Sequence, residues 1–156
     1  MHRSTFIILI TLACIFSACQ KQSEYSEKNI NQLLNSWHKA AADAKLEEYF
    51  RLMTENATYI GTDPNERWTR EEFYQFCKPY FEKGRSWDFK AFDRKIYASE
   101  NNKTIWFDEL LNTWMGVCRG SGVLSLENGE YKISHYHLSV TIKNESIKEF
   151  LQIKQD

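Results

Sequence analysis

Apolar residues follow a helical spacing near the start of the chain and a strand spacing in its second half. One stripe has the i, i+3, i+4, i+7 pattern of an amphipathic helix over residues 30–44, and its members are Ile30, Leu33, Leu34, Trp37, Ala41 and Ala44. A second, short helix is expected over 46–53. A third is expected over 69–81, where Thr69 and Glu72 form a capping box and Gly84 marks the end.

After Gly84 the apolar pattern changes to a period of two residues. Long strands are predicted over 87–99, 104–114, 117–126 and 131–142. Asn128-Gly129 is typical of a tight hairpin turn, and a short strand over 57–61 precedes the turn residues 62–65. Helices followed by long antiparallel strands indicate an α+β domain whose helices pack on one face of a single sheet.

The N-terminal segment has the pattern of a secretion signal. Arg3 supplies a positive charge, and residues 6–16 form an apolar run that only Thr11 interrupts. A membrane-spanning helix needs about 20 apolar residues, so this run is too short for a permanent anchor. Ser17-Ala18 before Cys19 resembles a bacterial lipobox, in which the cysteine thiol receives a lipid. The alternative is an ordinary cleaved signal peptide.

These patterns predict how the chain is processed and divided. We expect residues 1–18 to be a signal peptide and 19–28 a flexible tether lipidated at Cys19. One domain is expected over 29–143 and a C-terminal tail over 144–156. The protein would then belong to the bacterial cell envelope and contact a membrane through its lipid anchor only.

Charge and cysteine content narrow the choice of partners. The chain has 20 basic and 21 acidic residues, and removal of Arg3 with the signal peptide leaves 19 basic residues against 21. No basic block occurs, which argues against a nucleic-acid partner. Cys77 and Cys118 would remain beside Cys19. They could form a disulfide or stay free, because sequence does not fix their separation.

Several short motifs occur in a characteristic order, and they are Trp37-His38, Tyr59-Ile60-Gly61-Thr62, Trp68, Trp106-Phe107, Arg119-Gly120-Ser121-Gly122 and Tyr131-Lys132-Ile133-Ser134-His135. Together they resemble the nuclear transport factor 2-like superfamily, and more narrowly its SnoaL-like branch. The resemblance implies a cone in which three N-terminal helices pack in a strongly bent antiparallel sheet and enclose a largely apolar pocket. The superfamily contains isomerases, cyclases, dehydratases and carrier domains, so the fold does not settle the function.

Alternation along the strands groups the polar residues that would face such a pocket. It places Trp106 and Asp108 on one face of their strand, Arg119 on one face of the next, and His135 and His137 on one face of the last. A bulge would reverse these assignments. The predicted ligand-binding residues are Trp37, Tyr59, Trp106, Asp108, Arg119, His135 and His137.

Asp108 and His135 are the candidates for proton transfer. A carboxyl group among apolar neighbours and an imidazole can both titrate near neutral pH. The alternatives are an ion pair between Asp108 and Arg119, and purely structural roles for His135 and His137. A metal site would need both histidines and a third ligand, Asp108 or Glu109. Trp37, Tyr59 and four further tryptophans, at 68, 87, 106 and 114, could stack on a flat ligand or simply form the core.

Taken together, the sequence predicts a SnoaL-like envelope lipoprotein that binds a small, mainly apolar ligand in its cone. Arg119 would hold a polar or anionic end of that ligand. One alternative is an isomerase, cyclase or dehydratase that transfers a proton in the same pocket. Another is an interaction module whose sheet forms a homodimer or pairs with another envelope protein. No cofactor and no metal is expected.

Overall fold

The computed structural model describes residues 25–154. The first part comprises α1 (Glu27–Ala42), α2 (Leu46–Arg51), β1 (Met53–Ile60), β2 (Arg67–Thr69) and α3 (Arg70–Glu82). The second comprises β3 (Lys90–Ala98), β4 (Thr104–Thr113), β5 (Gly116–Glu127), β6 (Glu130–Val140), the 3-10 helix η1 (Asn144–Ser146) and α4 (Ile147–Ile153). The predicted signal peptide, the lipidation site Cys19 and most of the predicted tether lie outside the described residues. None of the helices formed by residues 25–154 is long and apolar enough to cross a membrane.

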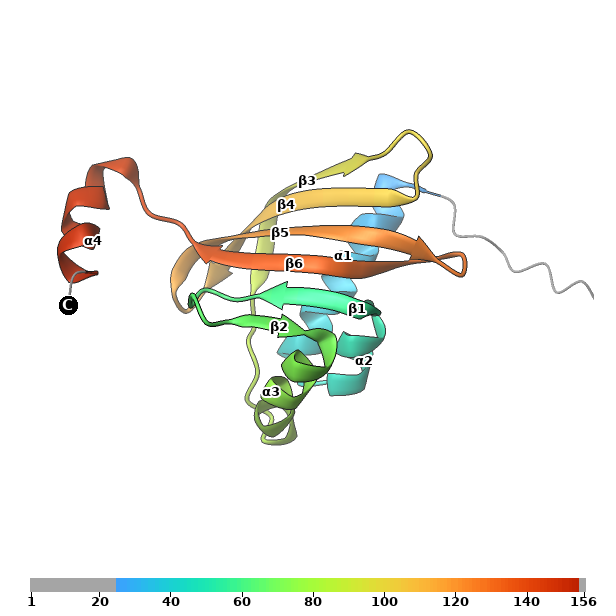
Figure 1. Ribbon diagram of the computed structural model, residues 1–156, viewed down its shortest axis with the longest axis horizontal. Coiled ribbons are helices and arrows are strands. Elements are labelled where there is room, and N and C mark those ends of the chain that lie inside the picture. Colours follow the sequence, from blue (N-terminus) through green and yellow to red (C-terminus); the bar gives the residue numbers. More distant parts are fainter. Residues whose placement is uncertain (1–24, 155–156) are drawn as a thin grey trace, which may run out of the picture.

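Six strands form one curved sheet in the order β2-β1-β6-β5-β4-β3. The strands β3 to β6 form an antiparallel meander, whereas β1 lies parallel to β6. In Figure 1, α1 crosses behind β4, β5 and β6, and α2 and α3 lie beside β1 and β2. This arrangement confirms the predicted α+β cone.

The predicted helix signals act as expected in α1 and α3. Ile30, Leu34 and Trp37 are buried on the inner side of α1. The Thr69 side chain accepts a hydrogen bond from the backbone N–H of Glu72, and the Glu72 carboxylate accepts one from the backbone N–H of Thr69. The capping box therefore fixes the start of α3.

Several element boundaries differ from the prediction. The second helix ends at Arg51, and β1 begins at Met53 because Met53 already pairs with Ile133 of β6. The short strand β2 was not predicted, and β3 begins at Lys90 rather than at residue 87. The expected C-terminal tail contains η1 and α4.

Aromatic side chains fill much of the space between the helices and the sheet. Trp37 stacks on Tyr49 with ring centroids 4.8 Å apart, and Tyr59 stacks on Phe73 at 3.8 Å. Tyr136 meets Trp37 edge to face at 4.7 Å. The interior of the cone is thus a packed aromatic core rather than one large cavity. The two cysteines at 77 and 118 are buried in this domain as free thiols.

Two bulges set which strand residues face the core. In β6, Ser134 is an extra residue, because Ile133 pairs with Leu124 while His135 pairs with Val123. In β3, the register shifts between Phe92 and Lys95, and Asp93 has a positive φ of 47° there. Each bulge reverses the in-and-out alternation of the residues that follow it.

Candidate functional site

Most of the predicted ligand-binding residues lie on the outer face of the sheet, which corrects the prediction that they line the cone. These residues are Trp106, Asp108, Arg119, His135 and His137. The alternation of side chains along the strands did predict correctly that these five residues share one face of the sheet. The inner face is instead formed by residues such as Phe107, Glu109 and Leu111, all of which are buried. In β6 the Ser134 bulge turns the histidines outward after Tyr131 and Ile133 have pointed inward.

The polar residues of this outer face are paired or exposed. Arg119 Nη1 lies 3.1 Å from Asp108 Oδ1, which is the ion pair considered as an alternative for Asp108. Partial burial, followed by the nearby charges of His137 and Arg67, lowers the pKa of His135. Within residues 25–154, no three His, Cys, Asp or Glu side chains are grouped in a way that could hold a metal ion. Because both lie on the outer face of the sheet, neither candidate catalytic residue, Asp108 or His135, lies in the cone.

The remaining two predicted residues lie inside the domain. Trp37 is a fully buried member of the core. Tyr59 is also buried, but its side chain lines a small aromatic pocket between α3, β1, β2 and the segment that precedes β3. The pocket has a volume of about 140 Å³, and its aromatic walls are formed by Tyr59, Trp68, Phe73, Phe76, Trp87 and Phe89.

The aromatic pocket has stacked walls and one acidic group. Trp68 stacks on Phe76 with ring centroids 4.7 Å apart, and Trp114 lies at the pocket with 84% of its surface exposed. Glu66 is the only charged side chain among the described residues that line it. Its carboxylate packs against Gly61, where a Cβ atom would collide with it. Gly61 therefore makes room for the acidic group at this aromatic surface.

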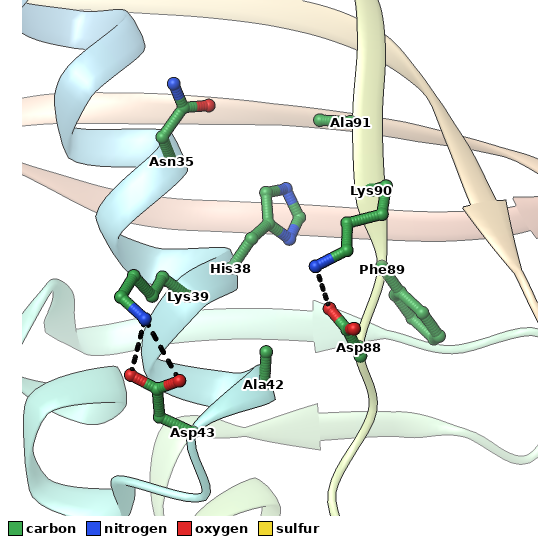
Figure 2. Close-up of a pocket in the computed structure, with 9 residues that line it drawn as sticks. All are labelled: Asn35, His38, Lys39, Ala42, Asp43, Asp88, Phe89, Lys90 and Ala91. Atoms are coloured by element: carbon green, nitrogen blue, oxygen red, sulfur yellow. Dashed lines mark hydrogen bonds and ion pairs between the residues drawn. The ribbon is translucent and has the colours of Figure 1, made fainter.

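A second, larger pocket of about 420 Å³ lies between α1 and the start of β3. Figure 2 shows His38 and Lys39 projecting from α1, with Asp88 and Lys90 on the opposite segment. Lys39 pairs with Asp43 at 2.8 Å, and Lys90 pairs with Asp88 at 2.7 Å. We call this space the polar pocket. It lies next to the aromatic pocket, because Phe89 contributes to the lining of both.

A buried charged cluster lies behind His38. The Nε2 atom of His38 is 2.7 Å from Oε1 of Glu109, and the Tyr136 hydroxyl donates to the same oxygen at 3.1 Å. On the other side, Arg94 Nε donates to Oε2 of Glu109 at 2.7 Å. Arg94 Nη1 also donates to the Asn35 side-chain oxygen at 2.9 Å. The β3 bulge places Arg94 in this position.

The electrostatics of the cluster define the hydrogen-bonding role of His38. Burial alone would raise the pKa of Glu109, but the hydrogen bond and charge of His38 together with the charge of Arg94 outweigh it, so the pKa is lowered. An ionised carboxylate only accepts hydrogen bonds, so Nε2 of His38 carries a proton. Within residues 25–154, Nδ1 of His38 has no hydrogen-bond partner. When the ring carries no charge, Nδ1 can accept a hydrogen bond or a proton at the polar pocket, while Glu109 orients the ring through Nε2.

The sequence held partial signals for this cluster. His38 follows Leu34 by one helical turn, so it shares the buried stripe of α1. Glu109 alternates with Phe107 and Leu111 on one strand face, and a carboxylate on a buried face needs a partner. Arg94 could not be assigned in this way, because its direction depends on the β3 bulge.

Comparison with known families agrees with this cone of helices and curved sheet. A family model described as a SnoaL-like domain matches residues 30–143. The chain therefore belongs to the SnoaL-like domain family. No curated protein sequence matches it significantly.

Solved structures with the nuclear transport factor 2-like fold are similar at low sequence identity. A protein of unknown function from Pseudomonas putida is 12% identical with a TM-score of 0.64, covering 77% of this chain and 89% of that one. A protein from Cytophaga hutchinsonii is 14% identical with a TM-score of 0.64, covering 76% and 100%. A proposed dehydratase from Streptomyces avermitilis is 11% identical with a TM-score of 0.63, covering 74% and 96%. At these identities the likeness concerns the fold alone.

Proposed function

We propose that this protein binds a small, mainly apolar molecule by inserting one flat ring into the aromatic pocket. The supporting observation is the pocket itself, about 140 Å³ in volume with stacked aromatic walls. An apolar cavity of about 150 Å³ is large enough to hold benzene. Offset stacking on Trp68 and Phe76 would add to the gain from burying the ring.

The charge at the pocket defines the polar end of the ligand. The sequence suggested that Arg119 would hold an anionic end, but Arg119 is on the outer face. Glu66 is the charged group at the aromatic pocket. A carboxylate accepts hydrogen bonds and repels anions, so the ligand would carry a hydroxyl or an ammonium group rather than a carboxylate. Aromatic faces also attract cations.

Calorimetry on the intact chain in nanodiscs tests this proposal with three small probes of similar size. Phenol and benzylamine should bind, and benzoate should bind more weakly. Trp68→Ala should weaken binding of both favoured probes, and Glu66→Gln should reduce the preference for benzylamine. Trp106→Ala is the matched control, because this tryptophan lies on the outer face. Preferred binding of benzoate, or equal binding by Trp68→Ala and wild type, would overturn the proposal.

A second candidate function is proton transfer in the polar pocket, and it rests on the hydrogen bond between His38 and Glu109. His38 Nδ1 would take a proton from an activated C–H or O–H group, and Glu109 would stabilise the resulting imidazolium. A positioned base of this kind contributes about 10²–10⁴-fold to a rate. This chemistry would suit an isomerase, cyclase or dehydratase, and His38 replaces Asp108 and His135 in the role of base.

Deuterium exchange from solvent into acetylacetone or 2-tetralone, followed by NMR, tests the second candidate. Wild type should exchange these activated C–H groups faster than buffer does. His38→Gln, which keeps a donor to Glu109, should remove the acceleration, whereas Lys39→Ala at the pocket rim should retain it. Exchange at the buffer rate, or an unchanged rate in His38→Gln, would exclude His38 as the base for these probes.

We also infer that the domain is held at the bacterial cell envelope by a lipid on Cys19, with no other membrane contact. The support is the charged start, the short apolar run and the Ser17-Ala18-Cys19 motif. Wild type should partition with membranes, and mass spectrometry should find an acylated Cys19 at the mature N-terminus. Cys19→Ala should lose the acyl group. A mature chain that begins elsewhere, or an unmodified Cys19, would contradict this inference.

A further inference from the structure

A third pocket, of about 430 Å³, lies at the end of the domain opposite α4. Its walls come from the first half of α1, the end of α2 and the hairpin that joins β5 to β6, at the right of Figure 1. We call it the hairpin pocket. It shares no lining residue with the aromatic pocket or the polar pocket. Small-molecule sites have volumes of about 300–1,000 Å³, so the hairpin pocket is large enough for a ligand of its own.

The floor of the hairpin pocket is apolar. Ile30 and Tyr131 line it as buried members of the core. Leu33 and Leu52 line it as partly buried side chains that pack against the core. The backbone N–H of Ile133 donates to the carbonyl oxygen of Leu52 at 2.8 Å, which fixes the end of α2 against β6. The floor is therefore a fixed apolar surface on which an aliphatic group can be buried.

Two charged side chains of opposite sign line the same pocket. Arg51 is the last residue of α2, and Glu130 is the first residue of β6. Within residues 25–154, neither side chain forms an ion pair or a hydrogen bond. The pocket therefore offers a guanidinium group that can donate hydrogen bonds and a carboxylate that can accept them.

We propose that the hairpin pocket binds a small zwitterion with an aliphatic group, the chemistry of a free α-amino acid such as leucine. Arg51 holds the carboxylate of this ligand, because the planar guanidinium matches two carboxylate oxygens. Glu130 accepts hydrogen bonds from the ammonium group, and the aliphatic side chain lies on the floor beside Leu33. This site is separate from the proposed ring site in the aromatic pocket, so it adds a second ligand to the function proposed above.

Ligands of other charge fit the hairpin pocket less well. Glu130 would repel an anion, and Arg51 would repel a cation. A neutral apolar molecule would cover both charged groups without pairing either of them, which costs free energy. An amino acid carries both charges on one carbon atom next to its side chain. One small molecule can therefore reach both charged groups and the apolar floor.

Saturation-transfer NMR titrations on the intact chain in nanodiscs test the proposal with four probes, and empty nanodiscs give the background. L-Leucine has all three features, N-acetyl-L-leucine lacks the ammonium group, L-leucinamide lacks the carboxylate, and glycine lacks the side chain. Leucine should bind most tightly. Loss of either charge should raise the dissociation constant by about fivefold, or about 1 kcal/mol, the upper range for an exposed ion pair. Glycine should bind about tenfold more weakly, because it has no side chain to bury.

Two variants assign the charged groups. Arg51→Gln should remove the preference for leucine over leucinamide and keep the preference over N-acetylleucine, and Glu130→Gln should do the reverse. Both side chains are exposed, so urea unfolding should be almost unchanged. Lys39→Ala in the polar pocket is the matched control and should keep the wild-type affinities. Leucine that does not bind, or binds no tighter than any of the other three probes, would overturn the proposal, as would unchanged preferences in either variant.

Discussion

Replacing Glu109 by glutamine tests the energetic role of the buried cluster. The carboxylate is fully buried and lies between Arg94 and His38, at 2.7 Å from each. Glutamine keeps the size of the side chain and removes its negative charge. The guanidinium of Arg94, whose side chain is only 7% exposed, then stays buried without a counter-charge.

The expected loss of stability is large. Removing one partner of a buried ion pair typically costs about 3–5 kcal/mol, because the remaining charge is desolvated without compensation. A domain of this size has about 5–15 kcal/mol of total stability, so the variant should be near the limit of folding. The double variant Arg94→Gln/Glu109→Gln removes both charges. It should lose less than the sum of the two single variants.

The dependence on pH gives the prediction a second, independent measure. The pKa of Glu109 is lower in the folded protein than its ordinary value of 4.5. The carboxylate therefore contributes its full stabilisation above about pH 4.5, and this contribution is lost as the pH falls through the folded pKa. The stability gap between wild type and Glu109→Gln should be widest near neutral pH and should narrow under acid conditions.

Urea unfolding followed by tryptophan fluorescence measures both effects. The wild type and the three variants are compared at neutral pH and at several acidic values, with circular dichroism to establish that each variant is folded. Equal unfolding midpoints for wild type and Glu109→Gln at neutral pH would refute the argument that Glu109 compensates Arg94. Strict additivity in the double variant would show that the two charges are not coupled.

Substitutions at four further positions test the packing and a helix cap. Trp37→Ala should lower the free energy of unfolding in urea by about 3–5 kcal/mol because the indole is buried, whereas Trp106→Ala should lower it far less because its indole is 44% exposed. Gly122→Ala should lose about 1–3 kcal/mol, since the new Cβ would lie 2.7 Å from the backbone oxygen of His135. Thr69→Ala should lower the free energy of unfolding by about 0.5–2 kcal/mol through loss of the α3 cap, with Thr69→Ser as its control; an unchanged free energy of unfolding would contradict the cap.

Local signals predicted the elements of this fold well. The spacing of Ile30, Leu34 and Trp37 identified α1 and its buried side, because a helix shows its apolar stripe directly in the sequence. Asn128 and Gly129 both have positive φ, at 51° and 83°, as the hairpin dipeptide requires. Such short-range chemistry depends on neighbours in the chain and can therefore be predicted from it.

The orientation of the sheet could not be predicted in the same way. Alternation shows which residues share a face, but Trp106 on one face and Phe107 on the other mean that both faces of β4 carry large apolar side chains. The face toward the helices is decided by tertiary packing. The Ser134 bulge then reverses the last strand, and nothing in the sequence around Ser134 marks an extra residue. The candidate site was consequently placed on the wrong side of the sheet.

The buried cluster has a partial signature in the sequence. His38 on an apolar helix stripe and Glu109 on an apolar strand face are both costly to bury alone. Two such residues in one small domain are therefore candidate partners in a buried hydrogen-bonded pair. Arg94 cannot be recognised as a buried residue in this way, because its neighbours in β3 are mostly exposed. Only the bulge brings it to Glu109.

The parallel pairing of β1 with β6 has a consequence for how the chain is made. On one side β1 pairs with the short strand β2, but on the other side, where Tyr59 pairs with Tyr136, its neighbour is β6, the last strand of the sheet. During synthesis, α1, α2 and β1 leave the ribosome long before that neighbour exists, and contacts so distant in sequence form slowly. The N-terminal half of the domain therefore has no complete core while the chain is being produced. A chain that stops before β6 should therefore remain open to proteases.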